Sequence, residues 1–346
     1  MPVITRELLR ALPKAELHCH LDGSVRPATL IELGRDYGTP MPADDPEELA
    51  SYMRVSDARN LEDYLARFSI TLSVLQTAEA LERVAYELME DAARDGVRYL
   101  EMRFAPVLNV RAGLTLGEAV EAPLRGIERA EREHGIRGRV IICGLRNMPP
   151  AASLELARLA VDYRDRGVVG FDLAGGERGN PASLHAAAFD HARRHDLAIT
   201  VHAGEGDGAE SVRQAVHVCG ANRIGHATHL YEDAALAQYV NDRRIALEIC
   251  LTSNVQTHAA ASYDAHPMRG YFYRGMNVVL NTDNRLMSGT TLTDEYLLAA
   301  RHLDFSLAEL GEIALNGFAS AFLPWEERRA MLDQVRREIA ALVACP

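Results

Sequence analysis

Lysine is nearly missing from this 346-residue chain. Lys14 is the only one, and arginine supplies the rest of the 37 basic side chains. No stretch gathers arginine into a basic stripe, and the formal net charge at pH 7 is −12. Nucleic acids and anionic membrane surfaces attract clustered cations, so we expect neither of them as a partner.

Long apolar runs are missing as well. No segment approaches the roughly 20 apolar residues that span a bilayer. Residues 1–18 lack the apolar stretch and the cleavage site of a signal peptide. The cysteines are few, odd in number and without a C-x-x-C pair, which favours free thiols in a cytoplasmic protein over a disulfide framework. They are Cys19, Cys143, Cys219, Cys250 and Cys345.

Short β-prone segments alternate along the chain with long stretches of helical periodicity. Internal repeats, low-complexity segments and linkers are absent, which indicates one domain over residues 1–346. Eight strands alternating with helices predict an α/β fold of the (β/α)8 TIM-barrel type, with a doubly wound sheet as the alternative. The expected strands are Ala15–His20, Val97–Phe104, Arg139–Leu145, Val168–Leu173, Ala198–His202, Arg223–His226, Ala246–Leu251 and Asn277–Thr282.

The interval between the first two expected strands is unusually long. They stand about 75 residues apart, whereas a plain crossover unit needs about 30. Residues 27–95 fill this interval with helical patterns, in which Asp57, Asn60 and Thr77 are candidate N-caps. We expect a helical insertion over the mouth of the barrel, where added segments often shape a pocket.

Polar residues follow four of the expected strands, at the ends where a barrel collects its catalytic groups. His18 and His20 are two residues apart on the first strand, so their side chains point the same way. Each polar group alone could be a helix cap or a hydrogen-bonded core residue, and Glu205 could be an acid in the first turn of a helix that follows at Ala209. Together the strand-end residues indicate a metal centre. Beyond the first strand they are His202, Glu205, His226, Asp283 and Asn284.

The residue types indicate which metal such a centre would hold. Three imidazoles and one carboxylate suit Zn²⁺ best, although Fe²⁺, Co²⁺ and Mn²⁺ accept the same ligands. Zinc lowers the pKa of a coordinated water to near 7 and so supplies hydroxide at neutral pH. Barrels with two metal ions usually bridge them with a carbamylated lysine at a strand end. Lys14 precedes the first strand, at the opposite end of the barrel, so we expect one zinc ion per chain.

Six stretches resemble the adenosine deaminase family, and they occur in the family's order. They are PKAELHCHLDGS (13–24), VVGFDLAGGE (168–177), TVHAGEGDGAESVRQAV (200–216), NRIGHATHL (222–230), EICLTSN (248–254) and VVLNTDN (278–284). The resemblance extends from about Pro13 to Asn316. It implies a (β/α)8 barrel that deaminates adenosine and 2′-deoxyadenosine hydrolytically to inosine and 2′-deoxyinosine, with release of ammonia. The implied partner is therefore a small purine nucleoside.

The resemblance also implies a role for each strand-end residue. Glu205 would donate a proton to purine N1, with a pKa raised by burial, and His226 would orient the attacking hydroxide or accept its proton. Asp283 would ligate the zinc ion and hydrogen-bond the water. The implied zinc ligands are His18, His20, His202 and Asp283. The implied substrate contacts are His20, Asp22 at the ribose, the backbone N–H of Gly175 at N3, and Asn284 at N7.

The sequence departs from the family's pattern at two places. Many members have Asp-Asp where this chain has Asp283-Asn284. Purine N7 is an acceptor, so an aspartate must be protonated to donate to it, whereas an asparagine amide donates at any pH. The base preference and its pH dependence are therefore open. Leu251 replaces a common proline and predicts a minor change in packing.

Asp22 bears on the choice of substrate. Its carboxylate suits sugar hydroxyls and repels a 5′-phosphate, which argues against AMP. Related adenine deaminases carry glutamate at this position, so Asp22 favours a nucleoside, although adenine and aminodeoxyfutalosine remain alternatives. A non-catalytic zinc- or nucleoside-binding protein is a third reading. The sequence does not distinguish a monomer from a homo-oligomer.

The remaining histidines have simpler expected roles. The set on expected helices should be exposed to solvent, and it comprises His185, His191, His195 and His217. Arg103, at the end of the second strand, is expected to be a structural or pocket-lining cation.

Overall fold

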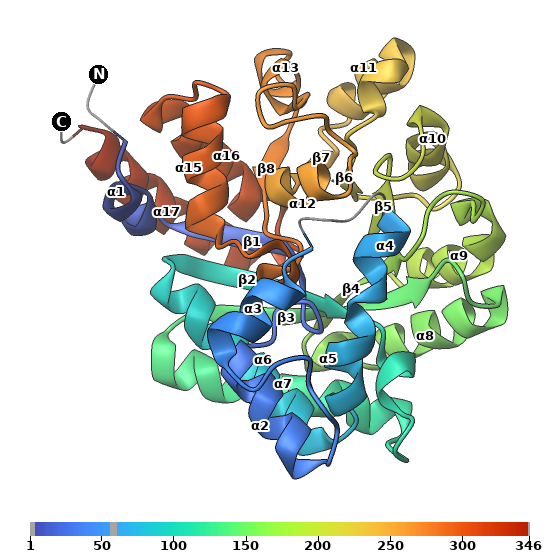
Figure 1. Ribbon diagram of the computed structural model, residues 1–346. Helices are drawn as coiled ribbons and strands as arrows, with labels where there is room; N and C mark the ends of the chain where they lie inside the picture. The colour runs from blue at the N-terminus through green and yellow to red at the C-terminus, as the bar shows by residue number, and fades with distance from the viewer. Residues whose placement is uncertain (1–3, 56–60, 345–346) are drawn as a thin grey trace.

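The computed structural model describes residues 4–55 and 61–344 and shows a barrel of parallel strands surrounded by helices (Figure 1). The strands pair in chain order, and every pair is parallel. A doubly wound sheet would reverse its strand order at a switch point, so the prediction of a (β/α)8 barrel is confirmed. The described strands are β1 (Lys14–His20), β2 (Val97–Phe104), β3 (Arg137–Leu145), β4 (Val168–Ala174), β5 (Ala198–Ala203), β6 (Arg223–His226), β7 (Ala246–Ile249) and β8 (Val278–Leu280).

The barrel closes between the first and last strands, close to the strand ends. Cys19 and Asp283 form a parallel bridge there. The backbone N–H of Asp283 donates to the carbonyl of His18 at 2.9 Å, and the N–H of His20 donates to the carbonyl of Asp283 at 2.7 Å. The closure therefore brings the end of β1 directly beside the segment that follows β8.

Two expected strands were too long at their carboxyl ends. β7 was expected to reach Leu251, but that residue begins helix α12, because the buried carboxylate of Glu295 accepts the backbone N–H of Thr252 at 3.2 Å and caps the helix. β8 was expected to reach Thr282, but it ends at Leu280. The N–H of Thr282 donates instead to the side chain of Glu16 at 2.8 Å. Both changes depend on partners distant in the sequence.

Helices surround the barrel and also cover one end of it. In the described part of the chain, five helices separate β1 from β2. Of these, α6 packs against α7 and β2, as a crossover helix does, whereas α2 to α5 are additional. The helices are α1 (Arg6–Ala11), α2 (Pro27–Asp36), α3 (Pro46–Met53), α4 (Leu61–Ala66), α5 (Phe68–Val74), α6 (Ala78–Arg94), α7 (Leu116–His134), α8 (Pro150–Asp162), α9 (Ala186–Arg194), α10 (Ala209–His217), α11 (Ala234–Asp242), α12 (Leu251–Gln256), α13 (Met268–Tyr273), α14 (Arg285–Ser288), α15 (Leu292–His302), α16 (Leu307–Ser320) and α17 (Trp325–Ala344), with short 3₁₀ helices η1 (Pro106–Asn109), η2 (Arg164–Arg166), η3 (Ala182–His185) and η4 (Leu230–Glu232).

The expected N-caps have different outcomes. Thr77 caps α6, and its side chain accepts the backbone N–H of Ala80 at 3.2 Å. Asp57 and Asn60 lie outside the described residues, as does Cys345. The other four cysteines are buried free thiols. None of the described helices is long and apolar enough to cross a membrane.

Lys14 and His185 lie deep inside the molecule. The ammonium group of Lys14, at the start of β1, donates to the carbonyls of Leu9 at 2.7 Å and Leu12 at 2.9 Å, and burial lowers its pKa to about 8. His20 is six residues further along the strand, roughly 20 Å away.

His185 was expected to be exposed, which was wrong. Its ring is 1% exposed and contacts the hydroxyl of Ser153 at 2.8 Å, because η3 turns it inward.

Candidate active site

The four expected metal ligands lie together where β1, β5 and β8 end. The Nε2 atom of His20 is 3.1 Å from Nε2 of His202 and 3.2 Å from Oδ1 of Asp283. Nε2 of His18 is 3.3 Å from the same Asp283 oxygen. The hydroxyl of Ser253 donates to the other oxygen, Oδ2, at 2.7 Å and so turns Oδ1 toward the imidazoles. Three imidazole nitrogens and one carboxylate oxygen therefore lie close to one another.

Carboxylates behind two of these rings determine which ring nitrogen carries the proton. Nδ1 of His18 lies 2.9 Å from Glu248, and Nδ1 of His202 lies 3.1 Å from Asp172. Ionised carboxylates only accept hydrogen bonds, so both rings carry a proton on Nδ1, and the neutral form of each ring has its lone pair on Nε2. In the described structure Nε2 of His18 is buried without any hydrogen-bond partner. Metal-binding histidines are held by carboxylates in this way.

The buried charges around the site leave room for a divalent cation. Among the described residues of this network, two guanidinium groups contact three carboxylates, and a fourth carboxylate, that of Asp283, contacts imidazoles and a hydroxyl. With neutral imidazoles these charges leave a surplus of two negative charges. A Zn²⁺ ion would neutralise this surplus, whose burial without compensation would be costly. The groups are Arg103, Arg223, Asp172, Glu248, Glu101 and Asp283. Arg103 is thus a fully buried structural cation, one of the two roles expected for it.

His226 lies beside the same cluster. One ligand atom each from His18, His202, His226 and Asp283 lie within 4.8 Å of one another. Nε2 of His226 is also 3.4 Å from Oε2 of Glu205. By distance alone, His226 and His20 are therefore alternative third imidazoles for the metal.

The backbone is strained at two of these positions. His226 has φ 64° and Asp283 has φ 61°, in the left-handed region of backbone conformation that residues other than glycine rarely occupy. Such a residue costs about 1–3 kcal/mol and persists only where the surroundings hold it. The barrel holds both residues in conformations that aim their side chains at the site.

Glu205 lies on the loop that follows β5 and faces the cluster. Its Oε1 accepts the hydroxyl of Thr257 at 3.2 Å, and the side chain is nearly buried. The alternative reading as a helix acid does not hold, because α10 begins four residues later, at Ala209, with Gly208 as its N-cap.

A second carboxylate, Glu177, organises this loop. It accepts four consecutive backbone N–H groups, those of residues 204–207, at 2.7, 3.0, 2.6 and 3.1 Å. Glu177 follows β4 by three residues and comes just after Gly175, whose φ of 96° requires glycine. One buried side chain therefore ties the loop of Gly175 to the loop of Glu205.

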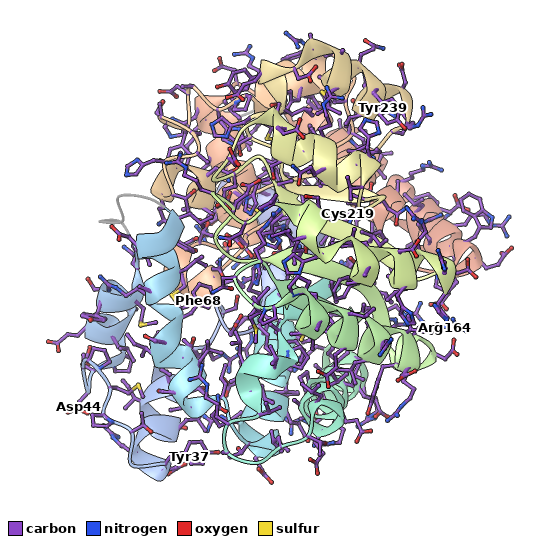
Figure 2. The ribbon with its side chains drawn as sticks, turned by 90° about the vertical axis from the view of Figure 1, so that its right-hand side faces the viewer. Tyr37, Asp44, Phe68, Arg164, Cys219 and Tyr239 are labelled. Atoms are coloured by element: carbon purple, nitrogen blue, oxygen red, sulfur yellow. The ribbon has the colours of Figure 1, made fainter. Side chains whose placement is uncertain are left out.

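The strand-end groups open into a cavity of about 370 Å³, within the range of small-molecule sites. Helices α4 and α5 supply apolar side chains to one wall, and Figure 2 places Phe68 of α5 between these blue helices and the barrel. The expected substrate contacts His20, Asp22, Gly175 and Asn284 also line the cavity. A larger open cavity of about 910 Å³ lies at the other end of the strands, around Ala198 and Ala246, and contains none of the strand-end groups.

Two polar residues of the cavity each have a buried oxygen without a hydrogen-bond partner among the described residues. Within the described structure, Oδ1 of Asp22 and Oδ1 of Asn284 are buried without hydrogen bonds. Burial raises the pKa of Asp22 to about 7. Asn284 packs on Gly23, where an added Cβ would lie 1.8 Å from Oδ1, so glycine is required there. Buried polar groups are normally paired, which favours a ligand with hydroxyl or amide donors beside Asp22.

Sequence reasoning missed the residues behind the site. Charged residues inside apolar strands were the available signal, since a charge on a buried strand must be paired. That signal marks Glu101, Asp172 and Glu248 but does not reveal their partners. Glu177, Ser253 and Asn254 lie within the stretches that resemble the family but were assigned no role, and Thr257 lies outside those stretches.

Buried imidazoles and a carboxylate converging at the strand ends of a barrel, beside an enclosed cavity, define a class: the metal-dependent hydrolases. Within that class the chain belongs to the adenosine deaminase family, whose model matches residues 13–338, and it is a hydrolytic deaminase. The match extends beyond the stretches that first showed the resemblance.

Individual relatives agree with the family. A protein from Mycobacterium sp. (strain JLS) named adenosine deaminase is 42% identical over 357 aligned positions, which cover 99% of each chain. The crystal structure of adenine deaminase from Arthrobacter aurescens matches with a TM-score of 0.88 at 27% identity, covering 95% of this chain and 99% of its own. An amidohydrolase structure from Burkholderia ambifaria with bound Zn has a TM-score of 0.86 at 26% identity, covering 99% and 96%.

Proposed function

We propose that this protein deaminates adenosine and 2′-deoxyadenosine to inosine and 2′-deoxyinosine with one zinc ion per chain. One observation carries the proposal: a single cavity, which also contains Asp22 and Asn284, is lined by Glu205, His226 and three of the expected ligands, namely His20, His202 and Asp283. The adenosine deaminase name of relatives at 42% identity supports the same substrate. The lone lysine, buried at the far end of β1, supports a single metal ion.

The ligand atoms of His18, His20, His202 and Asp283 would hold the zinc ion. When bound, zinc lowers the pKa of water and supplies a nucleophile at neutral pH. In the overall reaction a C6–O bond forms, the C6–N6 bond breaks, and N6 takes a proton and leaves as ammonia. Water is the only second substrate that this balance needs.

The chain's own residues would divide the remaining work. Glu205 holds a proton for N1, which draws electron density from C6. Asp22 accepts ribose hydroxyls, the N–H of Gly175 donates to N3, and the amide of Asn284 donates to N7. Helices α2 to α5 would act as the insertion that closes the cavity and excludes water, and the apolar side chains that α4 and α5 place on its wall support this role.

Ammonia release from a panel of 6-aminopurines tests the proposal. We expect the highest kcat/KM with adenosine or deoxyadenosine, and lower values with adenine, AMP and aminodeoxyfutalosine. The adenine deaminase similarity makes adenine the most informative competitor. Preference for adenine would replace the proposed substrate, and no turnover with any member of the panel would contradict the proposal altogether.

Replacing Glu177 with glutamine should lower kcat by about tenfold with a smaller change in KM, because the loop of Glu205 loses one of its acceptors and shifts. Glu232→Gln is the matched control, since Glu232 accepts the N–H of Ala209, at 3.2 Å, at the far end of the same loop. Steady-state kinetics of both variants checks this. An equal loss in the two variants would contradict the role given to Glu177.

A further inference from the structure

A chain of three hydrogen bonds leads from a backbone N–H to His226. The N–H of Met268 donates to Nδ1 of His266 at 3.1 Å. Nε2 of His266 lies 3.1 Å from Oδ1 of Asn254, and Nδ2 of Asn254 lies 3.0 Å from Nδ1 of His226. The three side chains in this chain are buried, so solvent does not compete for the bonds.

The N–H of Met268 determines where each proton lies along this series of hydrogen bonds. A backbone N–H can only donate, so Nδ1 of His266 must accept. His266 is 3% exposed, and burial lowers its pKa to about 3, so the ring is neutral and carries its single proton on Nε2. That proton requires an acceptor, which places the oxygen of the Asn254 amide toward His266. The amide nitrogen then faces His226.

His226 is the last member of the chain. The amide N–H of Asn254 donates to its Nδ1, which must therefore bear a lone pair. The proton of His226 consequently lies on Nε2, the atom 3.4 Å from Glu205. This is the reverse of His18 and His202, whose carboxylate partners put the proton on Nδ1 and leave Nε2 bare.

We propose that Asn254 and His266 are positioning residues that hold His226 in the Nε2–H tautomer, so that His226 enters the reaction as a hydrogen-bond donor. An Nε2–H group can neither coordinate a metal nor accept the proton of water. These hydrogen bonds thus exclude His226 from the metal ligands and leave His20 as the third imidazole. They also favour a role in which His226 orients the attacking hydroxide over one in which it accepts a proton. Its catalytic part rests on the proposed function, whereas the tautomer does not.

The first test is ¹⁵N NMR of the zinc-loaded protein labelled at histidine, because long-range ¹H–¹⁵N correlations show which ring nitrogen carries the proton. We expect the Nε2–H form for His226. In Asn254→Asp the new carboxylate accepts from both rings, so the proton of His226 should move to Nδ1. The signals of His185, buried elsewhere, should not change and serve as the internal control.

Kinetics tests the consequence for catalysis. Loss of one well-placed donor predicts a fall in kcat of about 10²-fold for Asn254→Asp, with KM changed much less. His266→Gln keeps an N–H donor near the position of Nε2 and should retain most activity, whereas His266→Leu should lose it. These two His266 variants test the series of hydrogen bonds even if Asn254→Asp fails to fold.

Three results would overturn the proposal. They are an Nδ1–H tautomer in the unmodified protein, a tautomer switch in Asn254→Asp that leaves kcat as it was, and equal activity of the two His266 variants. Because the spectrum requires no turnover, it decides the tautomer even if adenosine is not the substrate.

Discussion

Glu205→Gln should reduce kcat for adenosine by about 10³-fold, because proton transfer from a positioned acid contributes about 10²–10⁴-fold to such reactions. Glutamine has nearly the same shape and can still donate a hydrogen bond toward N1. It cannot give up a proton, so substrate binding should survive while the chemical step fails. The nearly buried position of Glu205, at 6% exposure, leaves little access for a water molecule to replace it.

Steady-state kinetics and inosine binding distinguish this outcome from a damaged site. The variant should bind inosine and zinc as the unmodified protein does, since the four ligand residues are unchanged. A kcat within threefold of the unmodified protein would remove Glu205 from its proposed role. Loss of inosine binding together with kcat would indicate a structural role instead.

Removing the metal with a chelator should abolish ammonia release and lower the stability of the protein. Without a cation, the network retains its surplus of two buried negative charges, and the Nε2 atoms of His20 and His202 lie 3.1 Å apart with no metal ion to bind them. A ligand that binds only the folded state at 1,000 times its Kd stabilises that state by about 4 kcal/mol. Restoring zinc should therefore return both activity and melting temperature.

The stoichiometry of reconstitution tests the single-metal proposal. Activity should return in proportion to zinc and saturate at one ion per chain, measured by elemental analysis. His229→Ala is the control, because His229 lies near the site but its Nδ1 contacts the carbonyl of Gly204 at 3.1 Å, outside the cluster. Saturation at two ions, or undiminished activity after complete removal of the metal, would contradict the prediction.

Local patterns accounted for much of the fold. The alternation of β-prone and helical segments predicted all eight strands, and the ends of β2 and β6 agree with the expected ones to the residue. The carboxyl ends of β7 and β8, which were each predicted two residues too far, depend on Glu295 and Glu16, whose partners are 43 and 266 residues away. A pattern that spans a few residues carries no information about such partners.

The same distinction applies to the histidines. His185 was expected in solvent because it lies on an expected helix, yet η3 turns it toward Ser153, 32 residues earlier. Asn284 could be recognised from the sequence as a departure from the family. Its packing on Gly23, which requires a residue without Cβ, became apparent only in the structure.

The metal centre shows which properties of the site the sequence determines and which it does not. The sequence determined the residue types, their places at strand ends and the shared direction of His18 and His20, because strand periodicity and family motifs are local properties. Only the tertiary structure decided which nitrogen of each ring is bare. That choice depends on partners such as Glu248, 230 residues from His18, and Asn254, 28 residues from His226. A proton on an imidazole follows the nearest acceptor or donor in space, and closure of the barrel determines which group that is.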